Sequence, residues 1–145
     1  MADEQIKQPT VLIVDDEIDM RIFISTLFET NGYKSVSTRD GGSGLRKAAE
    51  ILPDLIVLDV MMPGEGGVTM YQGLKADTSL KRIPVIMLSA VARKTYNHYL
   101  KMLDVQSDGA LPGPDAYMEK PPEARELIGL ANRLLGKEQR AENGE

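Results

Sequence analysis

The sequence lacks cysteine and tryptophan, and it contains a single histidine, His98, among 145 residues. Without cysteine, the chain has no disulfides, no zinc–thiolate sites and no thiol nucleophile. One histidine argues against a histidine-rich metal site and against a Ser-His-Asp triad, so a surface or packing role is the simpler expectation for His98. No apolar run approaches the roughly twenty residues that a membrane helix requires, and the polar, acidic N-terminus does not resemble a secretion signal. The sequence therefore predicts a cytoplasmic protein with no membrane contact.

Positive charge is also scarce, because 17 basic residues stand against 22 acidic ones and give a net charge of -5. Nucleic-acid binding needs a basic surface, so direct DNA binding is not expected. The hydrophobic fraction of 42% and the charged fraction of 27% are ordinary for a globular protein. The length fits one domain. We predict a polar lead over residues 1–9, one domain over 10–136 and a polar tail over 137–145.

Apolar, largely β-branched segments alternate along the chain with segments of helical periodicity. The predicted strands cover residues 10–14, 33–37, 55–58, 83–90 and 116–120. Segment 33–37 has few apolar residues, which suits an edge strand, whereas the continuous run 55–58 is typical of a strand buried on both faces. Such alternation predicts an α/β fold: a doubly wound five-stranded parallel sheet flanked by five helices, flavodoxin-like, with strand order 2-1-3-4-5.

Four of the predicted helices follow apolar stripes, and a turn is expected over residues 40–44 (DGGSG). The stripe of the first helix is Met20, Phe23, Ile24 and Leu27, and that of the second is Leu45, Ala48, Ala49 and Leu52. The stripe of the fourth helix is Tyr96, Tyr99, Leu100 and Leu103. The stripe of the last helix is Leu127, Leu130, Ala131 and Leu134. The third helix carries Met70, Tyr71 and Leu74 on one face. Residues 107–115 (SDGALPGPD) show no periodicity and are predicted to form a loop.

Polar residues end four of the five predicted strands, and the exception is the edge strand. Asp15 and Asp16 follow the first strand, Asp59 the third, Ser89 the fourth and Lys120 the last. In a parallel sheet these ends share one edge, and the crevice of the 2-1-3-4-5 order lies between strands one and three. Three converging carboxylates repel one another, and a hard divalent cation relieves that repulsion. Magnesium suits the site because it takes one or two carboxylates and keeps positions for water and phosphate oxygens.

Lys120 and Ser89 add the groups that a phosphate needs at this edge. A lysine ammonium pairs with a phosphate oxygen, and a small hydroxyl donates a hydrogen bond to another. Carboxylates are known nucleophiles that form aspartyl-phosphates. The combination indicates phosphoryl transfer to an aspartate. Taken singly, the aspartates also suit helix caps and turns, Ser89 a turn, and Lys120 a solvated charge; the joint placement favours the chemical interpretation.

With these residues in view, the chain resembles the receiver domain of bacterial two-component response regulators, of the stand-alone type. The matching motifs are VLIVDDE (11–17), DLIVLDVMMPG (54–64), VIMLSA (85–90) and YMEKP (117–121), in the order of that family. The likeness extends over about residues 10–136. It implies a signalling switch that assists its own phosphorylation and dephosphorylation and is not a classical enzyme.

The resemblance assigns a role to each matching position. Asp59 is the phosphoacceptor, supplied by a sensor histidine kinase or a phosphotransfer protein. Asp15 and Asp16 hold Mg²⁺ together with Asp59, and the backbone carbonyl of Met61 is a further ligand. Lys120 takes the position of the family's lysine. Ser89 takes the position of the switch hydroxyl and Tyr117 that of the switch aromatic. In that family these two residues alter the face built from the fourth helix, the last strand and the last helix. A protein partner, which the sequence does not name, would recognise that face.

The segment between Ser89 and Lys120 is longer than is usual in that family, and the extra residues lie at about 104–115. The sequence therefore leaves open a second interpretation, an interaction module that keeps the fold without being phosphorylated. A magnesium-dependent phosphohydrolase fits less well, because it would need an acid two residues beyond the nucleophile, where Met61 stands. A flavin carrier is weaker still, since the first loop is acidic. Nothing after residue 136 suggests an output domain, so output through protein contacts is expected. The alternative is an intermediate of a phosphate relay.

Overall fold

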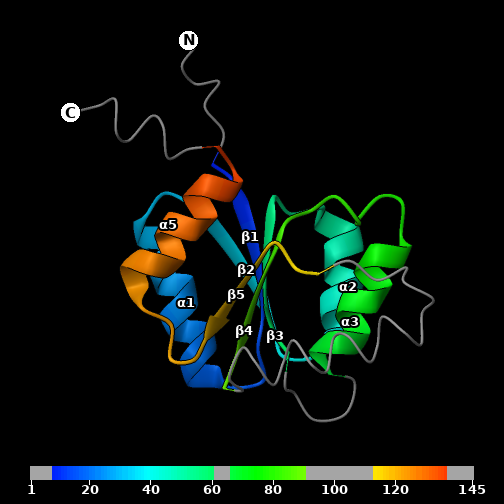
Figure 1. Ribbon diagram of the computed structural model, residues 1–145, viewed down its shortest axis with the longest axis horizontal. Helices are drawn as coiled ribbons and strands as arrows, with labels where there is room; N and C mark the ends of the chain where they lie inside the picture. The colour runs from blue at the N-terminus through cyan, green and yellow to red at the C-terminus, as the bar shows by residue number, and fades with distance from the viewer. Residues whose placement is uncertain (1–7, 61–65, 91–112, 137–145) are drawn as a thin grey trace.

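The computed structural model describes residues 8–60, 66–90 and 113–136, and these form one parallel sheet with helices on both faces (Figure 1). The strands are β1 (Thr10–Val14), β2 (Lys34–Thr38), β3 (Leu55–Asp59), β4 (Val85–Ser89) and β5 (Ala116–Glu119). The described helices are α1 (Ile18–Thr30), α2 (Gly41–Ile51), α3 (Gly67–Ala76) and α5 (Ala124–Leu134). The strand order is β2-β1-β3-β4-β5, and every pairing is parallel. The predicted sheet and its order are confirmed.

Four of the five predicted helices lie in the described residues. The fourth prediction, together with His98, Met61 and most of loop 107–115, falls outside the described ranges. In Figure 1, α1 and α5 cover one face of the sheet and α2 and α3 cover the other. No helix of the described ranges is both long enough and apolar enough to cross a membrane.

Alternate residues of the central strands enter two separate cores, which explains why β1, β3 and β4 are apolar without interruption. One core joins Val11, Ile13, Leu55 and Val57 to the inner faces of α1 and α5. The other joins the intervening strand residues to α2 and α3, and it includes Val14, Leu58, Met70, Tyr71 and Tyr117. The edge position of β2 agrees with its weaker apolar pattern.

The predicted stripe of α1 is wrong in one position. Phe23 is 43% exposed, whereas Ile24 and Phe28 are buried and Met20 and Leu27 are partly buried. The helix is apolar on more than one side, so its periodicity alone does not say which side meets the sheet. Phe28 is held there by an edge-to-face contact with Tyr33, whose ring centroid lies 4.9 Å away. Burial raises the pKa of Tyr33 to about 12, and the carboxylate of Asp54 adds to the effect.

The segment predicted as a turn over residues 40–44 is the start of α2. Asp40 is the N-cap residue, and its Oδ1 accepts a hydrogen bond of 2.7 Å from the backbone N–H of Ser43. That bond lowers the pKa of the Asp40 carboxyl. At the other end, Leu52 caps α2 in the left-handed region with φ of 48° and is 57% exposed, so it leaves the predicted stripe.

Two aspartates set the register at the amino edge of the sheet in the same way. The Asp54 N–H donates to the Thr10 carbonyl at 2.8 Å, and Asp54 Oδ2 accepts from the Thr10 N–H at 2.8 Å. The Asp115 N–H donates to the Val85 carbonyl at 3.1 Å, and Asp115 Oδ2 accepts from the Val85 N–H at 2.8 Å. Each aspartate thus forms hydrogen bonds with both the N–H and the carbonyl of the first residue of a neighbouring strand.

Glycines permit the close approach of α2 and α3 to the rest of the fold. A Cβ at Gly44 would lie 2.8 Å from Met70 Sδ and 2.9 Å from Val14 Cγ2. A Cβ at Gly67 would overlap the carbonyl oxygen of Asp59 and lie 2.7 Å from Val60 Cα. At Gly129, within α5, an added Cβ meets no atom within 4 Å.

These contacts predict three different effects of the same Gly→Ala substitution on the free energy of unfolding. Gly129→Ala should stabilise by roughly 0.5–1 kcal/mol, because alanine favours the helix. Gly44→Ala should destabilise by about 1–2 kcal/mol through overpacking, which Met70 relieves in part. Gly67→Ala should cost more than Gly44→Ala, because it meets backbone. Urea unfolding followed by far-UV circular dichroism measures the order, and a Gly67→Ala protein as stable as the Gly129→Ala protein would contradict this packing.

Candidate functional site

Asp15 and Asp16 leave the carboxyl end of β1 in a loop that hydrogen bonds hold in place. Asp15 is buried and Asp16 is exposed. Asp15 Oδ1 accepts a bond of 2.9 Å from the backbone N–H of Glu17, and Arg21 Nη1 donates to the Asp15 carbonyl at 2.8 Å. Arg21 belongs to α1, so the helix that follows the loop also fixes the loop backbone.

Asp59 is the last residue of β3, at the centre of the sheet, and it is buried. The next residue stays tied to the sheet, since the Val60 N–H donates to the Leu88 carbonyl at 3.0 Å. The Gly67 N–H in turn donates to the Val60 carbonyl at 3.3 Å. The start of α3 therefore abuts the backbone that carries Asp59, which is why position 67 has no room for a side chain.

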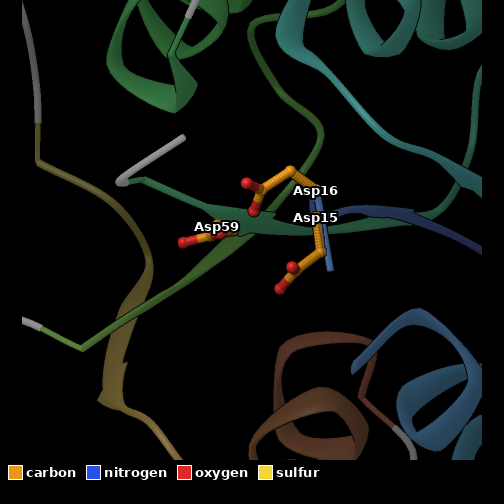
Figure 2. Close-up of side chains that lie close together, drawn as sticks. All are labelled: Asp15, Asp16 and Asp59. Carbon is orange, nitrogen blue, oxygen red and sulfur yellow. The ribbon is translucent and has the colours of Figure 1, made fainter. Parts of the chain in front are cut away.

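The three aspartates meet in the crevice between β1 and β3, as the sequence predicts. One carboxylate oxygen from each of Asp15, Asp16 and Asp59 lies within 4.8 Å of the others. Figure 2 shows the three side chains close together at the ends of the two strands, with the Asp16 carboxylate turned toward Asp59. Ligand distances of about 2.1 Å place two Mg²⁺ ligands at most about 4.2 Å apart. The donor set is all oxygen and needs only a small closure, so it fits a divalent cation of that kind.

Lys120 reaches the same crevice from the end of β5. Its Nζ lies 2.9 Å from Asp15 Oδ2, 3.3 Å from Asp59 Oδ2 and 3.3 Å from Glu17 Oε1. Burial alone would lower the pKa of this ammonium, but the carboxylates of Asp15 and Asp59 outweigh it and hold the pKa above its usual value. Lys120 is therefore a permanent positive charge near neutral pH.

Ser89 and Tyr117 lie close to this lysine in the sheet. Ser89 is buried at the carboxyl end of β4, and its carbonyl accepts a bond of 2.8 Å from the Lys120 N–H. Tyr117 pairs with Met87 in register and packs in the α2–α3 core. The Lys120–Pro121 peptide bond is cis. The structure thus brings together five of the predicted residues at one edge. Tyr117 lies within β5, three residues before Lys120, whereas Met61 lies outside the described ranges.

The sequence does not predict a role for three residues of the site: Glu17, Arg21 and Gly67. Glu17 follows the acidic pair directly, and its position in the loop at the same sheet edge is the signal that places it within reach of Lys120. The contact of Arg21 with a backbone carbonyl leaves no pattern in the sequence. The close approach at Gly67 is also invisible there, because several glycines surround it.

Chemically, the edge offers two complementary halves. The three aspartates supply negative oxygen ligands for a cation, and Lys120 supplies a fixed positive charge next to the most central carboxylate. Such a pair suits a group that carries negative charge and also binds a divalent cation, as a phosphoryl group does.

The chain is similar in sequence and in fold to known response regulators. Residues 11–130 match the family described as the response regulator receiver domain. The chain is 34% identical over 128 residues to the polar-differentiation response regulator DivK of Brucella anthropi, covering 88% of this chain and 96% of DivK. Chemotaxis protein CheY4 of Vibrio cholerae superposes with a TM-score of 0.76 at 25% identity, covering 88% of this chain and 99% of that one.

A longer relative matches in one part only. The phosphate regulon transcriptional regulatory protein PhoB of Escherichia coli is 32% identical over 125 residues, which are 86% of this chain. The match covers 51% of PhoB, so the chain spans about half the length of that relative. Sequence, fold and site agree across 11–130, and the chain belongs to the response regulator receiver domain family.

Proposed function

We propose that this chain is a phosphoacceptor switch of a two-component phosphorelay, with Asp59 as the residue that receives the phosphoryl group. The donor is the phosphohistidine of a sensor histidine kinase or a phosphotransfer protein. The P–N bond to the donor histidine breaks as a bond forms between phosphorus and a carboxylate oxygen of Asp59, and the electron pair of the broken bond stays on the donor nitrogen. The observation that supports this best is the convergence of Asp15, Asp16, Asp59 and Lys120 in one crevice.

The remaining groups neutralise the negative charge of the transferred phosphoryl group. Asp15, Asp16, Asp59 and the carbonyl of Met61 would hold Mg²⁺, which supplies positive charge to the phosphoryl oxygens when bound. Lys120 neutralises a further oxygen from the β5 side. The protein thereby assists its own phosphorylation and dephosphorylation without being a classical enzyme.

Phosphorylation adds about -1.5 to -2 of charge and new acceptor oxygens to the carboxyl edge. Ser89 moves to donate to one of these oxygens, and Tyr117 turns into the space that Ser89 leaves. The face of the predicted fourth helix, β5 and α5 then changes, and a protein partner reads it. A shift from 1:99 to 99:1 between the two states requires about 5.5 kcal/mol of preference for the active one.

The net charge of -5 favours output through protein contacts over direct DNA binding. The match to DivK, which covers 96% of that protein, supports one receiver domain over residues 10–136 with polar ends. A cytoplasmic location is part of the same proposal.

The first test is intact mass after incubation with acetyl phosphate and Mg²⁺. The wild-type protein should gain the mass of one phosphoryl group, and it should do so only with Mg²⁺. Asp59→Asn should abolish the gain, because the nucleophile is lost. Asp54→Asn is the matched control at the opposite end of the same strand, and it should be phosphorylated like wild type. A folded wild-type protein that takes up no phosphoryl group would instead favour the unphosphorylated interaction module.

A second test measures the stabilisation that Mg²⁺ gives to the folded chain. Binding to the native state alone stabilises by about 2.7 kcal/mol at a Mg²⁺ concentration 100 times Kd. The thermal midpoint of the wild-type protein should therefore rise with MgCl₂, beyond the effect of KCl at equal ionic strength. Asp16→Asn should remove most of this increment while leaving the metal-free protein folded, since Asp16 is exposed. An undiminished increment in Asp16→Asn would contradict the assignment of this ligand.

A further inference from the structure

The ammonium group of Lys120 has an ion-pair partner outside the acidic cluster. Lysine has three N–H donors and no acceptor. Three carboxylates surround Nζ: Asp15 at 2.9 Å, Asp59 at 3.3 Å and Glu17 at 3.3 Å. Asp15 and Asp59 belong to the acidic cluster. Glu17 does not, so its contact with Lys120 needs a separate explanation.

Glu17 occupies a helix position that its side chain does not serve. It is the N-cap residue of α1, yet its side chain makes no cap hydrogen bond. Glutamate is not among the residues favoured there, which are Ser, Thr, Asp and Asn. The carboxylate instead extends to Lys120, as both a hydrogen bond and an ion pair. The side chain of Glu17 is 63% exposed and that of Lys120 is 12% exposed, so Glu17 approaches the lysine from the solvent side of the crevice.

We propose that Glu17 is a positioning residue that restrains Lys120 and competes with the phosphoryl group for its ammonium. The inference rests on the proposed function, because it takes Asp59 as the phosphoacceptor. With three carboxylates within 3.3 Å of its Nζ, Lys120 gives up one of these partners when it turns to a phosphoryl oxygen. Glu17 is the partner to be released, because Asp15 is buried beside the lysine and Asp59 carries the new group.

Competition sets the sign and the size of the effect. Removing the Glu17 carboxylate frees one donor of Lys120, so a phosphoryl group at Asp59 should be held more tightly. Ion pairs with one exposed partner contribute about 0.2–1 kcal/mol. The higher part of that range corresponds to a roughly two- to five-fold change in a dissociation constant. The folded state should be unaffected otherwise, since the side chain of Glu17 caps no helix.

The experiment measures the affinity of the trifluoroberyllate anion, a mimic of the aspartyl-phosphate, at saturating Mg²⁺ by ¹⁹F NMR. Glu17→Gln should lower the dissociation constant two- to five-fold. Asp19→Asn is the matched control, because it removes one negative charge from the exposed first turn of the same helix and Asp19 is not an ion-pair partner of Lys120 among the described residues. It should change the constant by much less.

Glu17→Asp separates contact from charge. It keeps the charge but withdraws the carboxylate by about 1.5 Å, the length of one C–C bond, and it should therefore behave like Glu17→Gln. A second readout, the ¹⁵N-detected ammonium signal of Lys120 without trifluoroberyllate, should lose intensity through faster hydrogen exchange in both Glu17 variants and remain in Asp19→Asn.

The outcomes distinguish a failure of the role proposed for Glu17 from a failure of the phosphoacceptor role proposed for Asp59. If wild type binds the mimic and Glu17→Gln matches Asp19→Asn, the competition is refuted while the phosphoacceptor role stands. If Glu17→Asp matches wild type, charge and not contact decides, and the positioning role is refuted. If neither wild type nor any variant binds the mimic, the proposed function fails together with this inference.

Discussion

The charge balance at the carboxyl edge of the sheet is the constraint on which the site depends. The parallel strands bring Asp15, Asp16 and Asp59 together, and mutual repulsion would open this crevice without compensation. Lys120 compensates from the far strand β5, with its ammonium between Asp15 and Asp59. The lysine therefore joins strands that are not neighbours in the sheet, and its position depends on β4 through the backbone bond to Ser89.

The sheet order and five of the residues at its edge are predictable from the sequence because they follow from repeating patterns. Apolar runs such as Leu55 to Leu58 specify strands buried on both faces, and the parallel arrangement then places every strand end on one edge. Asp59 and Lys120 converge for that reason alone. Their proximity follows from the strand order alone and can be predicted without any measured distance.

What the sequence does not show depends on rotations and close contacts. Phe23 and Phe28 are equally apolar, yet Phe28 is buried against Tyr33 and Phe23 is 43% exposed. Gly67 has the backbone of Asp59 and Val60 against it, a contact that the glycine-rich sequence around it does not reveal. The sequence places Glu17 next to the acidic pair, but its contact with Lys120 also depends on a side-chain direction that no periodicity encodes.

Aspartate has opposite uses at the two edges of this sheet. At the amino edge, Asp54 and Asp115 are each bonded to both backbone groups of an adjoining strand. At the carboxyl edge, aspartates keep oxygens directed into the crevice. Sliding of β1 against β3, or of β4 against β5, would break the bonds at the amino edge. The strands are thereby anchored at the end of the sheet that lies opposite the crevice.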